Sequence, residues 1–309
     1  MRKIFITGAA GQLGSDVVRE ARRRGYEAAA SARAVPPGAP GISGCLDITD
    51  REAVLRTIGQ ASPDCVIHCA AWTAVDAAEK AENRARVDAV NRLGTRYVAE
   101  AAAAAGAKMI YISTDYVFDG QGERPWRPED PAPAPLNVYG ETKLAGEREV
   151  RALLSDFFIV RVSWVFGPKG ENFVKTMLRA GGKHGSVRVV NDQIGTPTYT
   201  RDLSRLLIDM AETEKYGVYH AANSECAPGA YISWYDFAKE IFRYTGTDAS
   251  VIPVTTEEYG LTGAARPRNS RLDKSKLAAA GFTPLPAWDD ALHRFLRELG
   301  AAKAPSPEA

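Results

Sequence analysis

The stretch "ITGAAGQLG", Ile6 to Gly14, sets the first expectation about the fold. Its three glycines lie where an apolar strand turns into an amphipathic helix. Glycine there permits a tight turn and lets backbone amides at the helix N-terminus approach a pyrophosphate, whose charge the helix dipole favours. A glycine trio alone also occurs in plain turns, but at the start of a βαβ series it predicts a dinucleotide site. The residues expected to contact that cofactor are Gly8, Gly11, Gln12, Leu13 and Gly14.

The pattern that begins at this loop continues through the first half of the chain. Short apolar segments alternate with longer amphipathic ones, which predicts an α/β fold, a Rossmann-type doubly wound parallel sheet covered by helices on both faces. Gly25 is expected just after the first helix, and Thr49 with Glu52 is expected to form a capping box for the second. The expected strands are 3–8, 26–32, 64–70, 107–113 and 157–163, and the expected helices are 12–24, 49–60, 84–105 and 139–154.

The alternation loosens after about residue 166, which predicts a second, smaller domain. We expect an NAD(P)-binding Rossmann domain over 1–165, with segments near 190–222 returning to it, and a discontinuous C-terminal substrate-binding domain made mainly of 166–309. Residues 34–44 are interpreted as a loop, and the tail 303–309 as frayed. Clusters of glycine and proline support this division at 167–170, 181–185, 226–230 and 281–286.

Composition narrows the classes of function. The chain has 309 residues, 45% hydrophobic and 25% charged, which is typical of a globular protein with a full core. A net charge of +1 provides no global field for nucleic acid or an anionic membrane. Four cysteines without metal-type spacing indicate reduced thiols and a cytoplasmic location. No apolar stretch of about 18 residues and no cleavable leader is apparent.

The end of the second expected strand bears on which dinucleotide is bound. This position commonly holds an acidic residue that grips the ribose 2′-hydroxyl, but "AAASARA" offers Ser31 and Arg33 instead. An arginine there can meet a 2′-phosphate, which favours NADPH over NADH, although NADH stays possible and Arg33 could equally be a solvated loop residue. Further cofactor contacts are expected from Asp47 and Ile48 at the adenine, and from the small residues Ala70 and Ala71 at the sheet edge.

The segment "NVYGETKLAG" contains the candidate catalytic pair, Tyr139 and Lys143. Residues four apart share one face of a helix, and a neighbouring ammonium lowers the pKa of a phenol from its usual value of about 10. Taken alone, such a pair usually lies on a solvated helix. Ser113 and Thr114, at the end of the fourth expected strand, change this interpretation, because open α/β sheets bind ligands at that edge. We expect Ser113 to contact the cofactor and Thr114 to bond the substrate oxygen that Tyr139 protonates.

Several motifs in order resemble the dTDP-4-dehydrorhamnose reductases, a family of extended short-chain dehydrogenase/reductases. They are "STDYVFDG", "PLNVYGETKLAGE", "RVSWVFG", "NFVKTML", "NDQIGTPT" and "RPRNSRLD". The resemblance covers nearly the whole chain. It implies NAD(P)H-dependent reduction of a nucleotide sugar's C4 ketone in dTDP-rhamnose biosynthesis, with Tyr139 giving the proton, Lys143 holding the nicotinamide ribose and Thr114 polarising the carbonyl.

The same resemblance implies the substrate contacts. Asp115 and Trp164 would contact the sugar, and Arg266, Asn269 and Ser270 match the "RP", small residue, "NS" pattern of the family, although Arg268 stands where the small residue is usual. From the residues alone, Asn172 is expected to cap a helix whose N-terminus receives the diphosphate, with Lys175 in that helix. Structural alternatives stay open: a packing role for Trp164, and surface roles for Lys175 and Arg266.

Other proteins share parts of this pattern and give rival functions. A 4,6-dehydratase would need a glutamate where this chain has Tyr116, so dehydration is disfavoured. An epimerase or another nucleotide-sugar 4-ketoreductase uses the same hydride chemistry. The regulatory subunit of methionine adenosyltransferase resembles these reductases and acts by association.

Some relatives are dimers bridged by Mg²⁺, so a homodimer and Mg²⁺ are possible, but no carboxylate cluster locates the ion. The nucleotide base and the sugar stereochemistry stay open.

Overall fold

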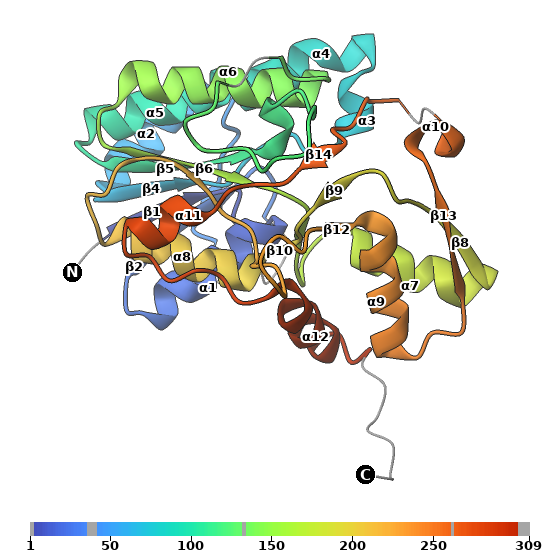
Figure 1. The fold of residues 1–309 in the computed structure, drawn as a ribbon. Coiled ribbons are helices and arrows are strands. Elements are labelled where there is room, and N and C mark those ends of the chain that lie inside the picture. The colour runs from blue at the N-terminus through green and yellow to red at the C-terminus, as the bar shows by residue number, and fades with distance from the viewer. Residues whose placement is uncertain (1–2, 36–41, 132–133, 261–262, 302–309) are drawn as a thin grey trace.

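The computed structural model describes residues 3–35, 42–131, 134–260 and 263–301 (Figure 1). The tail predicted to fray at 303–309 lies outside the described residues, as do residues 36–41 of the loop predicted at 34–44. Within the described part, helices and strands follow the expected order through residue 166.

A seven-stranded parallel sheet with the order β11-β6-β5-β4-β1-β2-β3 forms the larger layer of the molecule. The predicted Rossmann-type fold is therefore confirmed, and the carboxyl ends of the central strands meet at one edge, where open α/β sheets bind their ligands. The strands are β1 Lys3–Thr7, β2 Glu27–Ala32, β3 Gly44–Cys45, β4 Cys65–His68, β5 Lys108–Thr114, β6 Phe157–Val162 and β11 Gly217–His220.

Helices cover both faces of this sheet (Figure 1). On one face α1, Gln12–Arg23, packs against α8, Thr200–Ala211. On the other face α2, Arg51–Ala61, packs on α5, Gly94–Ala104, which in turn packs on α6, Val138–Leu153. Each face has its own apolar core, so the sheet is buried on both sides as its continuous apolar strands predict. Both α8 and β11 follow residue 166 in sequence and yet pack with the sheet.

Two local expectations have different outcomes. Gly25 follows α1 with φ of +80°, so the predicted helix end is confirmed. The predicted Thr49–Glu52 capping box is wrong. Asp50 is the N-cap of α2, its carboxylate accepting a hydrogen bond from the Ala53 amide at 3.0 Å, because the Thr49 hydroxyl donates to Asp47 instead.

The helix predicted at 84–105 contains a widened turn. It consists of α4, Ala81–Asp88, a π-helical turn at Ala89–Leu93, and then α5. Inside the turn lies Asn91, which is buried. Its amide bonds the backbone of Trp72 through both N–H and C=O and also reaches the Thr142 hydroxyl of α6 at 3.1 Å. The π turn therefore fixes the chain that follows β4 and the short α3, Val75–Ala78, relative to α6.

The smaller layer is assembled from segments after residue 164 around a core of its own. The strand β8 pairs with β13, and α7, α9 and α12 supply most of the apolar side chains of that core. The helices are α7 Phe173–His184, α9 Trp234–Thr245, α10 Thr256–Tyr259, α11 Ser275–Ala279 and α12 Trp288–Glu298. The strands are β7 Val165–Phe166, β8 Ser186–Val190, β9 Ile194–Gly195, β10 Thr198–Tyr199, β12 Ile232–Ser233, β13 Ser250–Val254 and β14 Asn269–Ser270.

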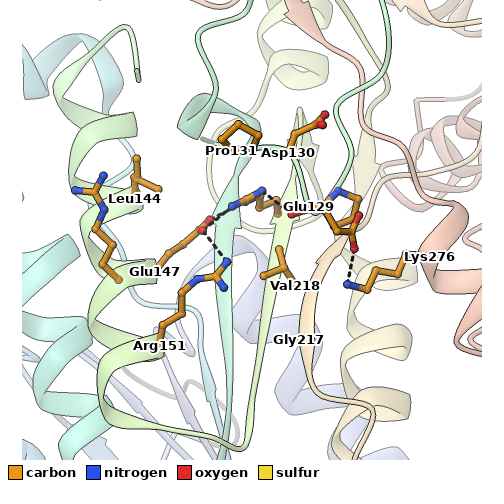
Figure 2. A pocket seen from close by; sticks show the side chains of 12 residues that line it. Glu129, Asp130, Pro131, Leu144, Glu147, Arg151, Gly217, Val218 and Lys276 are labelled. Atoms are coloured by element: carbon orange, nitrogen blue, oxygen red, sulfur yellow. Dashed lines mark hydrogen bonds and ion pairs between the residues drawn. The ribbon is translucent and has the colours of Figure 1, made fainter. Parts of the chain in front are cut away.

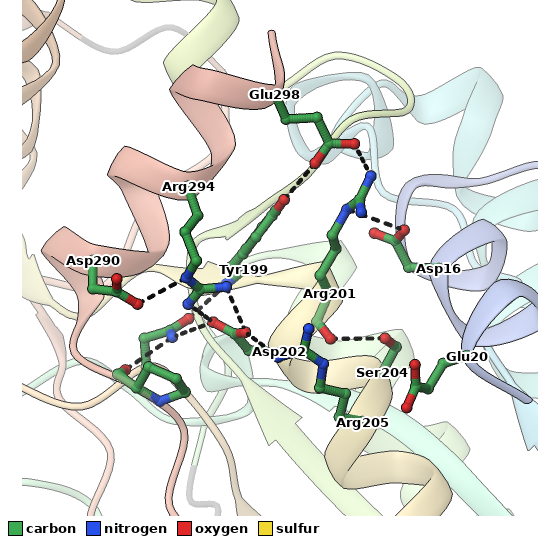
Figure 3. A network of polar contacts seen from close by, with 12 residues as sticks. Asp16, Glu20, Tyr199, Arg201, Asp202, Ser204, Arg205, Asp290, Arg294 and Glu298 are labelled. Atoms are coloured by element: carbon green, nitrogen blue, oxygen red, sulfur yellow. Dashed lines mark hydrogen bonds and ion pairs between the residues drawn. The ribbon is translucent and has the colours of Figure 1, made fainter. Parts of the chain in front are cut away.

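A polar network joins the two layers between α8 and α12 (Figure 3). The Arg294 guanidinium donates to both carboxylate oxygens of Asp202 at 2.9 and 2.7 Å, and the Asp202 side chain is only 1% exposed. The neighbouring Arg201 forms an ion pair with Glu298. These paired charges fix the C-terminal helix to a helix that packs on the sheet.

Candidate active site

A cavity of about 560 Å³ opens at the carboxyl edge of the sheet beside the glycine-rich loop. It brings together seven of the residues predicted to bind the cofactor, although they come from four separate stretches of sequence. These are Gly8, Gly11, Arg33, Asp47, Ile48, Ala70 and Ala71. A cavity of this size lies in the range of cofactor and ligand sites.

Backbone geometry explains two of the glycines. Gly8 has φ of +67°, and a Cβ there would lie 2.6 Å from the Ala70 amide nitrogen. A Cβ on Gly14 would lie 2.3 Å from the Gly8 carbonyl oxygen. Both positions therefore exclude any side chain. The small side chain of Ala70, which lines the cavity beside Gly8, occupies little of its space. The cradle has the narrow, glycine-lined shape that a pyrophosphate against a helix N-terminus requires.

Three other predicted cofactor residues lie apart from the cavity wall. Leu13 is buried in the core between α1 and the sheet. Gln12 donates to the Val165 carbonyl at 3.2 Å and accepts from Asn172, so its amide bridges the two layers. Ser31 is 3% exposed, and its hydroxyl has no hydrogen-bond partner within the described residues. Of the two side chains considered for the ribose, only Arg33 is among the described residues that line the cavity.

Helix α6 is set against the end of β5 by its first turn. Asn137 caps the helix, its side-chain oxygen accepting from the Gly140 amide at 2.8 Å, and its amide group donates to the Ala265 carbonyl at 2.7 Å. A Cβ on Gly140 would lie 2.2 Å from the Tyr116 carbonyl oxygen. Glycine at this position lets the helix start approach the turn after β5 closely, which brings Tyr139 to Thr114.

The environment of Tyr139 differs from the one predicted. Burial raises the pKa of Tyr139 to about 12, and a hydrogen bond with the Thr114 hydroxyl lowers that pKa by a smaller amount. The expectation that a neighbouring ammonium would lower this pKa is therefore wrong, because desolvation outweighs the other contributions. The phenol is fully protonated at neutral pH, as a proton donor must be.

Lys143 is buried, at 3% exposure, whereas Tyr139 is partly buried. Burial lowers the pKa of Lys143 to about 7, opposed by the negative charge of Glu147. Its ammonium lies 4.1 Å from the centre of the Tyr111 ring, a cation–π contact. The ammonium at neutral pH is therefore close to its titration midpoint and responds to any charge placed beside it.

The side chains at the end of β5 point in different directions. The Ser113 hydroxyl donates to Glu147 at 2.6 Å on the α6 side of the sheet. The Thr114 hydroxyl faces the site and donates to Asp115 at 3.1 Å. Burial raises the pKa of Asp115 to about 6, against hydrogen bonds from Ser270 and Thr114. Alternation along the strand therefore separates Ser113, which was predicted to contact the cofactor, from Thr114.

A second cavity, of about 410 Å³, lies between the two layers. Tyr116 lines it, and the Tyr139 ring packs edge-on against Tyr116 with centroids 5.7 Å apart. On the other side Lys143 interacts electrostatically with Cys69, which lines the first cavity. The predicted catalytic pair thus lies between the two cavities. The second cavity is lined, among others, by Asp76, Phe173, Met177, Gln193, Trp234, Tyr259 and Arg266.

The predicted substrate residues are dispersed around this second cavity. Arg266 lines it and donates to the Asp76 carboxylate at 2.7 Å. Trp164 stacks on Trp234, which lines the cavity, with centroids 3.8 Å apart. The φ of Trp164 is +49°, an unusual backbone conformation for a bulky residue, which often marks a functional or constrained position.

Other predicted substrate residues have partners within the protein. Asn172 caps α7 as expected, accepting from the Lys175 amide at 3.1 Å. The Lys175 ammonium donates to the carbonyls of Pro168 and Gly170 at 2.6 and 2.8 Å. The buried Asn269 side chain donates to two carbonyls of the 121–124 segment. Arg268, the departure from the family pattern, is exposed and pairs with Glu257 and Asp192.

Sequence reasoning missed several residues that the structure brings to the site. Asp76, Gln193 and Trp234 line the second cavity, and Glu147 lies beneath Lys143. A signal for Glu147 exists, because it lies four residues after Lys143 on the same helical face. For Asp76 and Trp234 no local pattern indicates a site, since they reach the cavity only through tertiary packing.

Within 3–35, 42–131, 134–260 and 263–301, no group of three or more His, Cys, Asp or Glu side chains could hold a metal ion. All four cysteines, Cys45, Cys65, Cys69 and Cys226, are free thiols. In the same described ranges, none of the helices combines the length and apolar character that crossing a bilayer requires.

A parallel sheet of this order, with a Tyr–Lys helix at its carboxyl edge, defines an extended short-chain dehydrogenase/reductase. Comparison with known proteins gives the family. A model described as the RmlD substrate binding domain matches residues 1–301, and the chain belongs to this family.

Individual relatives agree with this placement. The chain is 41% identical over 310 residues to dTDP-4-dehydrorhamnose reductase of Streptomyces griseus, covering 98% of this chain and 96% of that one. It is 38% identical over 302 residues to spore coat polysaccharide biosynthesis protein SpsK of Bacillus subtilis, covering 98% and 99%. The crystal structure of dTDP-4-dehydrorhamnose reductase from Bacillus anthracis in complex with NADP has a TM-score of 0.87 and 40% identity, covering 96% of this chain and 100% of that one.

Proposed function

We propose that this protein reduces the C4 ketone of dTDP-4-dehydro-L-rhamnose to dTDP-L-rhamnose with NAD(P)H, a step of nucleotide-sugar biosynthesis for cell-surface polysaccharide. The observation that carries the proposal is the position of Tyr139 and Lys143 between two cavities, one glycine-lined and one rich in aromatic side chains. The similarity of nearly the whole chain to proteins named dTDP-4-dehydrorhamnose reductase supports the proposal.

The chain's own residues have distinct roles in this reaction. The nicotinamide, when bound, supplies the hydride that reaches C4. Tyr139 gives its proton to the developing alkoxide, and Thr114, which shares a hydrogen bond with that phenol, polarises the ketone oxygen. Lys143 holds the nicotinamide ribose and stabilises the phenolate that Tyr139 leaves behind. Lys143 is buried and Tyr139 is partly buried, which limits the access of water and strengthens the electrostatic contacts of the pair.

The dinucleotide is NADPH in preference to NADH. Arg33 lines the first cavity, and no carboxylate from the end of β2 competes for the ribose hydroxyls. Asp47 also lines this cavity, and its pKa is lowered chiefly by the Thr49 amide and further by the charge of Arg33. A 2′-phosphate beside Arg33 would gain a charge-assisted hydrogen bond that NADH cannot form.

The second cavity takes the nucleotide sugar. Arg266 supplies a positive charge for the diphosphate, and Trp164 and Asp115 lie toward the sugar. Lys175 and Asn269, whose polar atoms are occupied within the protein, act through the loops that they hold. The reaction takes place in the cytoplasm, and a homodimer stays a prediction that the molar mass in solution would test.

The direct test offers purified protein dTDP-4-keto-L-rhamnose with NADPH and then with NADH. NMR should identify dTDP-L-rhamnose, with one cofactor oxidised for each product molecule. An epimerase would convert the sugar without net cofactor oxidation. One relative, 36% identical, is named dTDP-4-keto-6-deoxy-D-glucose reductase, so that ketosugar belongs in the same assay as an alternative substrate. A regulatory subunit would reduce neither sugar, and absence of reduction would overturn the proposal.

A further inference from the structure

Glu147 is a buried carboxylate one helical turn beyond Lys143 on α6. Its side chain is 1% exposed and accepts three hydrogen bonds from two residues. Oε1 accepts from the Ser113 hydroxyl at 2.6 Å and from Arg161 Nε at 2.8 Å, while Oε2 accepts from Arg161 Nη2 at 2.8 Å. Figure 2 shows Glu147 pointing from α6 toward the strands, with Arg151 reaching it from the next turn of the helix.

These contacts join three elements that together hold the reactive groups. The helix α6 carries Tyr139 and Lys143, β5 carries Ser113 directly before Thr114, and β6 carries Arg161. The Arg161 side chain is only 3% exposed and lies over the Phe118 ring at 5.0 Å. A buried ion pair loses much of its Coulomb energy to desolvation, so stability alone explains poorly why two charges are buried here.

The negative charge of Glu147 also acts on Lys143, and it opposes the effect of burial on the pKa of that ammonium more strongly than Cys69 does. The titratable groups that interact with this ammonium are Cys69 and His68 from the end of β4, Tyr111 from β5, and Glu147 from α6 itself. Burial raises the pKa of Cys69 to about 12 and lowers the pKa of His68 to about 3. Both are therefore neutral near pH 7, which leaves Glu147 as the carboxylate among them.

We propose that Glu147 is a positioning residue of the reductase, which ties the catalytic helix to β5 and β6 and keeps the buried ammonium of Lys143 charged. This inference rests on the proposed function. Through the Ser113 hydroxyl it also fixes the strand end that presents Thr114. Glu147 touches neither substrate nor cofactor, and acts through Lys143 and Ser113.

The negative charge of Glu147 determines the direction in which it shifts the pKa of Lys143. Glu147 raises the pKa of Lys143, whereas burial lowers it to about 7. Without the carboxylate, the ammonium loses its proton at lower pH. Reduction requires the charged form, so the alkaline limb of the kcat profile should move to lower pH.

The test separates charge from fold. Glu147→Gln alone leaves Arg161 buried without its partner and could unfold the chain. The double variant Glu147→Gln/Arg161→Gln removes both charges and keeps two amides that can pair. In this variant the alkaline limb should move down by about one pH unit, so that the ratio of kcat at pH 8 to kcat at pH 6 falls to about one fifth of the wild-type ratio.

Three further variants serve as controls. Arg161→Gln alone also breaks the ion pair between Arg161 and Glu147 but keeps the Glu147 carboxylate. The alkaline limb of the kcat profile of this variant should therefore not move to lower pH. Glu147→Asp keeps the negative charge, so the alkaline limb of its kcat profile should stay at the wild-type pH. Glu149→Gln removes a charge of α6 that pairs with Arg92 of the π turn and Arg96 of α5, and should leave the profile unchanged.

A second readout needs neither substrate nor cofactor. In protein carrying ¹³C-labelled lysine, the Lys143 signal is assigned by its loss in Lys143→Met and titrated by NMR. Its midpoint should fall by about one pH unit in the double variant and not in Arg161→Gln. An unchanged midpoint in a folded double variant would overturn the role of Glu147. A shifted midpoint in a protein that reduces no ketone would instead count against the proposed function.

Discussion

Asp76, in the short helix that follows β4, accepts a hydrogen bond at 2.7 Å from Arg266, which lies 190 positions later in the chain. The other carboxylate oxygen of Asp76 accepts a hydrogen bond from the Ala264 amide at 3.2 Å. Asp76 comes two residues after Ala74, which lines the dinucleotide cavity, and itself lines the second cavity. One carboxylate thus connects the two proposed ligand sites and neutralises an arginine proposed for the diphosphate.

Asp76→Asn should strengthen binding of dTDP about three- to tenfold, because an incoming diphosphate no longer meets a negative charge beside Arg266. Isothermal titration calorimetry with dTDP measures this. The matched control is Asp88→Asn, which removes a carboxylate of α4 that pairs with Arg92 of the π turn. This variant should bind dTDP as the wild type does. Weaker dTDP binding in Asp76→Asn would mean that the carboxylate chiefly orients the arginine.

Tyr139→Phe should lower kcat by about 10²- to 10⁴-fold, the usual contribution of a general acid, while the Kd for NADPH changes less than about twofold. Stopped-flow absorbance and cofactor fluorescence report the two quantities. Tyr235→Phe, a substitution of the same kind on α9, should leave kcat unchanged. Near-normal turnover in Tyr139→Phe would remove this phenol as the proton donor.

Lys143→Met should stabilise the protein while abolishing reduction. The unfolded chain binds a proton at this lysine up to its usual pKa of 10.5, whereas the folded protein loses it at about 7. Wild-type stability therefore falls as the pH drops from about 10 to 7, and this contribution falls no further below 7. The melting temperature of Lys143→Met should exceed that of wild type by a few degrees at pH 7, or about 1–2 kcal/mol, and by less at pH 9.5. An advantage that does not depend on pH would contradict this account.

Arg33→Ala should reduce the preference for NADPH by about 10- to 100-fold in kcat/KM, corresponding to the loss of a charge-assisted hydrogen bond to the 2′-phosphate. The kcat/KM for NADH should change little. Arg56→Ala, which removes an exposed arginine of α2, controls for the change in net charge. Equal losses with both cofactors would show that Arg33 does not read the 2′-phosphate.

Arg294→Met should destabilise the fold by about 2–3 kcal/mol, since the buried carboxylate of Asp202 loses a bidentate partner and is left with its weaker contacts to Asn223 and Arg205. Urea unfolding of this variant beside Arg297→Met, a change one turn further along on α12 near the helix end, measures the difference. The control should lie within about 0.5 kcal/mol of wild type. Equal stability of the two variants would show that the charges between α8 and α12 do not hold the layers together.

The sequence predicted the sheet because local signals and the fold agree there. The glycine turn at Gly8, the apolar strands and the helix end at Gly25 each follow from short-range chemistry. The capping box at Thr49 failed because Asp47, two residues earlier, offered that hydroxyl another acceptor. The π turn at Asn91 left no local mark, since what holds it is a pair of hydrogen bonds to Trp72.

For the site, the sequence predicted which residues are reactive, but it did not predict how burial changes their pKa values. Helical spacing places Tyr139 and Lys143 on one face, but only the packed protein shows that burial raises one pKa and lowers the other. In the same way, the spacing of Ser113 and Thr114 puts both hydroxyls at the sheet edge. Tertiary packing then assigns the Ser113 hydroxyl to Glu147 and leaves Thr114 for the site.

The stack of Trp164 on Trp234 gives the molecule an optical reporter. Two of the five tryptophans in the sequence lie with ring centroids 3.8 Å apart and planes 16° apart, one following the sheet and the other beginning a helix of the smaller layer. Indole rings this close couple their electronic transitions, so the pair should produce a circular dichroism couplet in the ultraviolet. Any rearrangement that slides the layers past each other when a nucleotide sugar enters would change that couplet, without the need for an attached dye.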